Sequence, residues 1–285
     1  HRVDRRQRQM CIRDSANTLY QPGGAFFDDP QWSALADWET DLAPHYVTAK
    51  RMLGVVERYP HTGPVERIMA GAADDLGVGG TFRNAPVGVW FGKPGERTAD
   101  PFFGGEGPDR TGCTLCGNCM VGCRVGAKNT LMKNYLALAE KRGVVIEALR
   151  TVTEVRELPG GGFSVTTERS GAWFRSERRT VRARQVVLAA GTWGTQQLLH
   201  RMKRAGALPR VSDAVGRLTR TNSEALDGAV AVAVPASLEL ARGVAITTSF
   251  HIDASTHVEN VRYGPGSNLM GCLLYTSDAA DDLLC

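Results

Sequence analysis

Four of the chain's seven cysteines stand close together in the stretch CTLCGNCMVGC, which runs from Cys113 to Cys123. Their spacing, C-x2-C-x2-C-x3-C, is one with which iron–sulfur proteins bind a cluster. Thiolates also bind zinc, and unmodified cysteines pack as small apolar side chains. This stretch is therefore the first candidate for chemistry, and three interpretations of it have to be separated.

An iron–sulfur cluster needs four thiolate ligands. In two-cluster ferredoxins the fourth cysteine of such a run binds the other cluster and precedes a proline. Here Arg124 follows Cys123, and the sequence contains no second run. A single cluster then needs a remote fourth ligand, for which Cys272 is the candidate. The run on which this alternative rests consists of Cys113, Cys116, Cys119 and Cys123.

A zinc site fits less well, because zinc ligands usually come as two pairs with a longer spacer between them, and this loop has no second pair. We favour the third interpretation, in which glycines and small apolar side chains let the loop pack tightly where it enters the following domain. On this interpretation the cysteines bind no metal, and an iron–sulfur site, a zinc site and a disulfide remain alternatives.

A second candidate is the segment RQVVLAAGTWGTQQLLHRMKRAGALP. Residues 186–190 form an unbroken apolar run, which is typical of a parallel strand buried on both faces. Gly191 and Gly194 predict a tight turn, and Thr195 can cap the helix that follows. Ligands of open α/β sheets lie at the carboxyl ends of the strands, where helix N-termini favour anions. The residues predicted to bind a dinucleotide here are Ala190, Gly191, Thr192 and Thr195.

The elements that would position these residues follow from apolar periodicity and from the placing of glycine and proline. We predict helices over residues 29–42, 44–53, 64–76 and 134–141. We predict strands within residues 84–92, 144–158, 159–168, 228–235, 243–253 and 256–264, and a solvated hairpin edge at 175–184. Alternation near the end of the chain indicates an antiparallel sheet with one polar face.

Composition limits the class of protein. With 285 residues, 42% of them hydrophobic and 22% charged, the sequence is typical of a soluble globular protein of about two domains. The net charge of +4 is small, and the basic run at 175–184 contains no stacking aromatic residue, so we expect no nucleic-acid partner. No window reaches the ~20 apolar residues of a membrane span. The compartment is not identified, although free cysteines slightly favour the cytoplasm.

Three separated motifs resemble, in the same order, the middle of the glucose-methanol-choline (GMC) flavin oxidoreductases, in particular their cholesterol-oxidase-like branch. They are AKNTLMKNYLALAEKRGVVIEALRTVTEV, VVLAAGTWGTQQLL and LTRTNSE. The resemblance implies an α/β chain, α+β overall, that contains a fragment of an FAD-binding Rossmann-like domain and a substrate domain with helices and an antiparallel sheet.

The resemblance also implies domain limits. Residues 16–112 would form the cap and substrate-domain helices with an FAD-contacting start, residues 113–222 the remainder of the FAD-binding domain, and residues 223–272 an incomplete substrate-domain sheet. The two ends, 1–15 and 273–285, show no apolar periodicity, and we expect them to be non-native tails.

FAD is the cofactor that the resemblance implies. The main chain of Val152 matches the position that faces the adenine, and Asn17 matches a position beside the isoalloxazine ring. The implied reaction is oxidation of the CH–OH group of an alcohol, a sterol or another bulky apolar alcohol, by hydride transfer to flavin N5. Electrons then pass to oxygen or to another acceptor.

The sequence also departs from the family. The Gly-x-Gly-x-x-Gly motif that holds the pyrophosphate is absent, and the catalytic histidine is expected beyond residue 272. We therefore predict no catalytic residue within the sequence and expect these residues alone to be an inactive fragment that binds FAD weakly. The histidines that we leave unassigned are His1, His45, His61, His200, His251 and His257. An iron–sulfur electron-transfer flavoprotein and a structural module held together by zinc remain alternatives.

Overall fold

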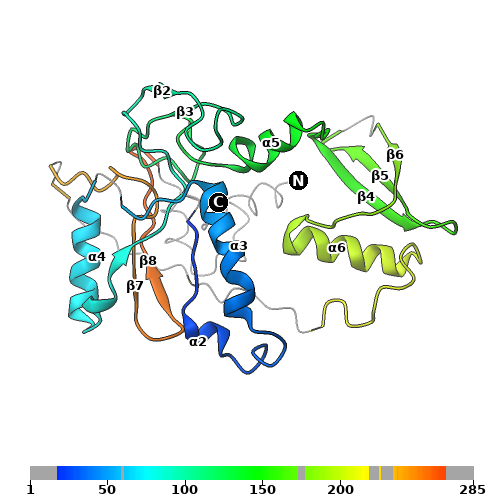
Figure 1. Cartoon of the computed structure of the whole chain (residues 1–285), viewed down its shortest axis with the longest axis horizontal. Coiled ribbons are helices and arrows are strands. Elements are labelled where there is room, and N and C mark those ends of the chain that lie inside the picture. Colours follow the sequence, from blue (N-terminus) through cyan, green and yellow to red (C-terminus); the bar gives the residue numbers. More distant parts are fainter. Residues whose placement is uncertain are drawn as a thin grey trace. The chain divides into compact units, whose positions relative to one another are not determined.

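The structure is a computed structural model that describes residues 18–58, 61–172, 177–217, 225, 234–235 and 237–267. The chain splits into two compact units. Val145–Asp227 form the first, here called the continuous unit, and the described residues before and after it form the discontinuous unit (Figure 1). Helices and antiparallel sheets occur along the chain, which confirms the predicted mixed class.

The continuous unit contains a three-stranded antiparallel sheet. Its order is β4 (Arg150–Glu157), β5 (Phe163–Arg169) and β6 (Arg179–Ala183). Glycines at 160–162 form the turn between β4 and β5, and two of them have the positive φ that glycine adopts readily. β6 is exposed along most of its length. The strands predicted within 144–158 and 159–168 and the predicted hairpin edge are therefore confirmed.

Helix α6 (Gly191–Arg204) packs against β4 and closes the core of this unit (Figure 1). Leu198 and Met202 are buried together with Val155 of β4. The Val155 N–H group also donates a hydrogen bond to Met202 Sδ at 3.2 Å. The helix ends before Gly206, whose φ of +62° is the left-handed conformation that usually follows a helix.

The apolar run at 186–190 is not a strand. None of the described strands includes it, and Val187 is 88% exposed. A buried parallel strand needs neighbouring strands that pair with its backbone and cover both of its faces. All described strand pairs are antiparallel. The prediction of a buried parallel strand is therefore wrong for this structure.

The discontinuous unit carries most of the helices. They are α2 (Gly24–Phe27), α3 (Trp38–Leu53), α4 (Pro64–Asp75) and α5 (Tyr135–Lys141), with short 3-10 turns η2 (Gly79–Thr81) and η3 (Leu131–Lys133). The helices predicted at 64–76 and 134–141 are confirmed. None of the described helices is long and apolar enough to cross a membrane.

Helix α3 replaces the two helices that were predicted on either side of Pro44. Residues 30–35 form turns, and α3 runs through Pro44 without a break. The helix begins where the Asp37 side chain accepts a hydrogen bond from the Thr40 N–H at 3.2 Å. It ends at Gly54, which has a φ of +57°. Capping at both ends thus fixes the helix in spite of its internal proline.

The discontinuous unit also contains two small sheets. One has the order β1 (Arg83–Asn84), β7 (Thr248–His251) and β8 (His257–Glu259), and the other pairs β2 (Arg97–Thr98) with β3 (Arg110–Thr111). All pairs are antiparallel, as predicted for the end of the chain. Residues 244–250 are buried on both faces, so polar side chains such as Thr247 and Ser249 do not form a solvent-exposed face. Most of the strand predicted at 228–235 lies outside the described residues.

A buried polar network joins α4 to residues just before β7 and just after β8. Arg262 forms an ion pair with Glu66, and the side chains are only 4% and 3% exposed. The Thr247 hydroxyl donates to Glu66 Oε1 at 2.6 Å, and the Gly63 N–H donates to Glu66 Oε2 at 2.6 Å. Burial raises the pKa of Glu66, but the Thr247 hydrogen bond and the Arg262 charge outweigh it, so the pKa lies below its ordinary value.

Candidate functional site

The predicted dinucleotide site lies at the start of α6 in the continuous unit. Gly191 is the first helical residue, with a φ of +69°, and Ala190 is the N-cap. Residues 190–192 are exposed, and a Cβ built on Gly191 would meet nothing within 4 Å. The first N–H groups of a helix have no acceptor within the helix. This open glycine turn therefore presents donors to an anionic or carbonyl group.

Thr195 does not cap α6 in the way that the sequence predicted. It lies inside the helix, and its Oγ1 accepts a hydrogen bond from the Ala190 N–H at 3.2 Å. The Thr195 hydroxyl, one turn into α6, thus holds Ala190, the residue before the helix, in place. The prediction of a Thr195 cap is replaced by a contact that fixes the same turn.

Val152 lies on β4 of the same unit. It pairs with Thr167 of β5, and a β-bulge follows between Val152 and Glu154. Its side chain packs against the core formed with α6. β4 is an outer strand of the sheet: β5 pairs with one of its edges, and none of the described strands pairs with the other edge. The unit therefore contains both Val152 and the start of α6, whereas Asn17 lies outside the described residues.

The surface of α6 also borders a wide, open hollow of about 780 Å³. A volume of this size is in the range of small-molecule sites. Thr192 is the predicted cofactor residue that lines it, and the side chains around it are mostly polar or basic. The other lining residues are Trp193, Gln196, Gln197, His200, Arg201, Arg204 and Gly216.

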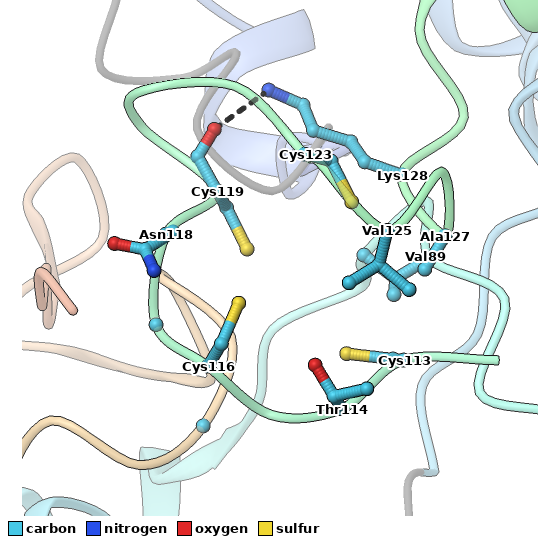
Figure 2. Close-up of a pocket in the computed structure, with 12 residues that line it drawn as sticks. Val89, Cys113, Thr114, Cys116, Asn118, Cys119, Cys123, Val125, Ala127 and Lys128 are labelled. Carbon is cyan, nitrogen blue, oxygen red and sulfur yellow. Dashed lines mark hydrogen bonds between the residues drawn. The ribbon is translucent and has the colours of Figure 1, made fainter. Parts of the chain in front are cut away.

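The four cysteines of the motif line one small cavity in the discontinuous unit. Its volume is about 10 Å³, room for about one water molecule. Figure 2 shows the four sulfur atoms directed from several sides toward the middle of the cavity. Cys113 and Cys119 are buried, Cys123 is half-buried and Cys116 is exposed, and none of the four forms a disulfide. We call this arrangement the thiol cavity.

The loop that carries these cysteines is held against the segment around Gly243. The Gly117 N–H donates to the Gly243 carbonyl at 2.9 Å, and the Gly243 N–H donates to the Leu115 carbonyl at 3.0 Å. Gly117 has a φ of +70°, and a Cβ at this position would meet the Ala241 carbonyl oxygen at 2.4 Å. Glycine is therefore required here for the loop to approach its neighbour.

Burial dominates the titration of the inner thiols. It raises the pKa of Cys113 to about 12 and also raises the pKa of Cys119. Backbone N–H groups oppose this effect, since Leu115 N–H donates to Cys113 Sγ at 3.4 Å and Ala245 N–H bonds to the Cys119 thiol. Both thiols hold their protons at neutral pH, so neither is an activated nucleophile.

Sequence reasoning missed how the motif closes on itself. It placed the fourth ligand of a single cluster at Cys272, which lies outside the described residues, whereas Cys123 lines the same cavity as the other three cysteines. The available signal was Gly122, whose φ of +104° turns the chain before Cys123. The pairing of the loop with Gly243 carries no such signal, because the two segments are far apart in the sequence. Among the residues that the structure describes, no three His, Cys, Asp or Glu side chains form a group that could hold a metal ion.

Comparison with known proteins adds an independent finding. Residues 107–213 match the family model described as GMC oxidoreductase. The chain is 52% identical over 263 residues to the cholesterol oxidase of Mycobacterium tuberculosis, with 90% of this chain and 45% of that protein covered. It is 41% identical over 267 residues to the cholesterol oxidase of Acinetobacter baumannii, with 90% of this chain and 48% of that protein covered. The chain thus spans about half the length of these relatives.

Proposed function

We propose, from the premise that this chain belongs to the GMC oxidoreductase family, that the protein is an FAD-dependent enzyme that oxidises the CH–OH group of an alcohol. FAD, when bound, supplies the acceptor for the hydride that leaves the alcohol carbon. The two relatives carry the name cholesterol oxidase. We therefore extend the proposal to a sterol or another bulky apolar alcohol as the substrate and to oxygen as the electron acceptor.

The observation that carries this proposal is the open glycine turn at the start of α6. It lies within the segment that matches the family model, and no side chain fills the space beside Gly191. The N–H groups of the first turn carry partial positive charge, which favours a phosphate or a carbonyl oxygen of the cofactor. The residues present at this turn therefore fit FAD.

Three features of the chain would hold the cofactor. The Gly191 and Thr192 N–H groups would donate to it, and the hydrogen bond from the Ala190 N–H to Thr195 Oγ1 would keep the turn in place. The main chain at Val152 lies on an outer strand, and the edge of this strand with which none of the described strands pairs could receive the adenine. We assign no residue of this chain to the proton transfer.

A glycine substitution tests the cofactor site. Gly191→Val adds a β-branched side chain at a φ of +69°, where such residues are strained, and it fills the space beside the turn. In the enzyme that carries this sequence, we expect flavin content and FAD affinity to fall about tenfold or more, equivalent to about 1.4 kcal/mol. Flavin absorbance per purified chain and FAD titration measure the loss.

The matched control is Gly160→Val at the turn between β4 and β5. A Cβ at Gly160 also meets nothing within 4 Å, and this glycine does not have a positive φ. We expect its flavin content to be unchanged. Equal flavin content in both variants would contradict a cofactor site at the start of α6. Formation of hydrogen peroxide with cholesterol, but not with ethanol, tests the substrate and the acceptor, and activity confined to small alcohols would reject the sterol.

A further inference from the structure

The end of the β7–β8 hairpin carries a group of side chains that the alcohol oxidation described above does not use (Figure 1). His251 ends β7 and His257 begins β8, and the two residues pair directly across the strands, with ring centroids 5.7 Å apart. Residues 252–256 between them are exposed. We call residues 251–257 the hairpin tip, and its two histidines are titratable groups at the point where the strands meet the turn.

Side chains from elsewhere in the discontinuous unit contact the hairpin tip. Thr81 Oγ1 accepts a hydrogen bond from the His251 N–H at 2.9 Å, and Arg83 Nη2 lies 3.3 Å from His251 Nε2. The Tyr20 ring stacks on the His257 ring, with centroids 4.2 Å apart and planes only 4° from parallel. Hydrogen bonds and ring stacking thus hold the tip.

The segment that carries Tyr20 is attached to the same part of the chain as Arg83. The Leu19 N–H donates to the Pro86 carbonyl at 3.0 Å, and Pro86 follows closely after β1, which contains Arg83. Tyr20 and Arg83 therefore lie on one side of the contact, and the two histidines of the hairpin tip lie on the other. The tip is closed as long as these two groups attract each other.

The contact between Arg83 and His251 requires an uncharged imidazole. A guanidinium group only donates hydrogen bonds, so His251 Nε2 accepts, and the ring carries its proton on Nδ1. A second proton, on Nε2, would remove the acceptor and place two cations at 3.3 Å. Protonation of His251 therefore converts an attraction between the tip and β1 into a repulsion.

The nearby carboxylates oppose that repulsion only in part. Asp253 lies in the turn, but its Oδ1 already accepts hydrogen bonds from the Ser255 and Thr256 N–H groups, at 2.8 Å each. Glu259 lies on β8, with its Oε1 3.7 Å from His257 Nε2, so its charge faces the other histidine. The Tyr20 ring faces both histidine rings as a neutral phenol.

Burial and the nearby cations act in the same direction on His251. Burial lowers its pKa from the ordinary value of 6.5, Arg83 and His257 lower it further, and Asp253 opposes them. A group with a depressed folded pKa contributes stability above its unfolded pKa, and this contribution is lost as pH falls through the folded pKa. The contact with Arg83 is therefore fully formed above pH 6.5 and is lost on acidification below it.

We propose that the hairpin tip is a pH-sensitive clamp, closed on Arg83 and Tyr20 while His251 is neutral and released from both when His251 takes a proton from water at Nε2. The proton adds to the lone pair of the ring, and no other covalent bond forms or breaks. Because His257 pairs with His251 across the strands, it moves with the tip, and Tyr20 then loses its stacked partner. This proposal does not depend on FAD or on the alcohol.

Nuclear magnetic resonance tests the clamp in the full chain. Titration of the histidine ring protons gives the pKa of His251, exchange of the His251 N–H reports opening from Thr81, and the ring-proton shifts of Tyr20 report loss of stacking. We expect a pKa below 6.5. Amide exchange, corrected for its intrinsic pH dependence, should be faster at about pH 5 than at about pH 7.5, by up to about tenfold for every pH unit between 6.5 and the folded pKa. A pKa of 6.5 or higher, or equal protection at both pH values, would overturn the proposal.

Two histidine variants and a matched control identify the group that senses pH. His251→Gln keeps an oxygen acceptor for Arg83 but takes up no proton, so the amide of residue 251 should be equally protected at both pH values. His257→Phe keeps a ring stacked on Tyr20 and should retain the pH effect. His45→Gln changes an exposed histidine of α3 and should behave like the unchanged protein.

A fourth variant tests the clamp from the side of β1. Arg83→Gln removes the guanidinium charge, and we expect the pKa of His251 to rise toward its ordinary value. Circular dichroism shows whether each variant is folded. A pH effect that persists in folded His251→Gln, or that disappears in folded His257→Phe, would contradict the role of His251. An unchanged pKa of His251 in Arg83→Gln would contradict the contact on which the clamp depends.

Discussion

The continuous and discontinuous units are held together in different ways. In the continuous unit, β4, β5 and β6 follow one another in the sequence and in the sheet, and α6 covers the strand that begins the series. In the discontinuous unit, strand β1 pairs with β7, and Glu66 pairs with Arg262, which is 196 positions away. Local patterns therefore describe the first unit, whereas the second depends on contacts between distant segments.

The largest effect is expected when the cation of the buried Glu66–Arg262 pair is removed. Arg262→Leu leaves the Glu66 carboxylate buried without its partner, and we expect a loss of about 3–5 kcal/mol in the free energy of unfolding. Urea unfolding measures the loss, and amide hydrogen exchange should place it in the discontinuous unit. A double variant, Glu66→Gln with Arg262→Leu, should be less damaged than the single variant. Equal loss in both would contradict a role for the unpaired charge.

A core truncation in the continuous unit should have the next largest effect. Met202→Ala removes a buried side chain that packs on β4, and we expect a loss of about 2–3 kcal/mol. Hydrogen exchange should increase in β4 and α6 and change little around α4. If the protection of both units fell equally, the separation into two compact units would not describe their stability.

A third variant tests the close approach of the cysteine loop to the segment around Gly243. Gly117→Ala places a Cβ near the Ala241 carbonyl and forces alanine to a positive φ, which should cost about 2 kcal/mol. Gly122→Ala is the control, because a Cβ there meets nothing within 4 Å, although its φ is also positive. We expect it to cost about 1 kcal/mol. The difference between the two midpoints of thermal unfolding isolates the close contact.

The pH dependence of the free energy of unfolding should reveal the contribution of the buried Glu66–Arg262 pair without any substitution at Arg262. The folded pKa of Glu66 is lowered from its ordinary value of 4.5, so the ionised carboxylate contributes stability above that pH, and this contribution is lost as pH falls through the folded pKa. We expect a smaller loss than in Arg262→Leu, because a protonated Glu66 keeps hydrogen bonds. Unfolding midpoints from pH 7 downward, compared with Glu66→Gln, measure it. Parallel curves for the two proteins would contradict the assignment.

The smallest effect is expected at an exposed ion pair of the discontinuous unit. Arg142 and Glu106 are 3.0 Å apart, but their side chains are 63% and 61% exposed. Arg142→Ala should therefore change the free energy of unfolding by less than about 1 kcal/mol. A loss as large as that of Arg262→Leu would contradict the expectation that burial decides the strength of these pairs.

The accuracy of the sequence predictions depends on whether an element is defined by local contacts, and not on which unit contains it. Alternation and helical periodicity predicted β4, β5, β6 and α6, since their contacts are local. The prediction of a buried strand at 186–190 was wrong because such a strand needs neighbouring strands that pair with its backbone, and none of the described strands pairs with this run.

The candidate site was predicted in part. The glycine turn at Gly191 lies at an open helix start, as expected from spacing alone. The convergence of Cys123 on the thiol cavity and the pairing of Glu66 with Arg262 could not be predicted, because neither residue type nor spacing indicates which distant segment lies opposite.

The Glu66–Arg262 pair also affects how the protein is made. A ribosome adds about 5–20 residues per second, so Arg262 follows Glu66 by roughly ten to forty seconds. During that time α4 has emerged without the strands that cover it, while the continuous unit is synthesised in full and can fold. The nascent chain therefore carries a completed unit beside an uncovered helix, and it is at this stage that we expect chaperones to bind.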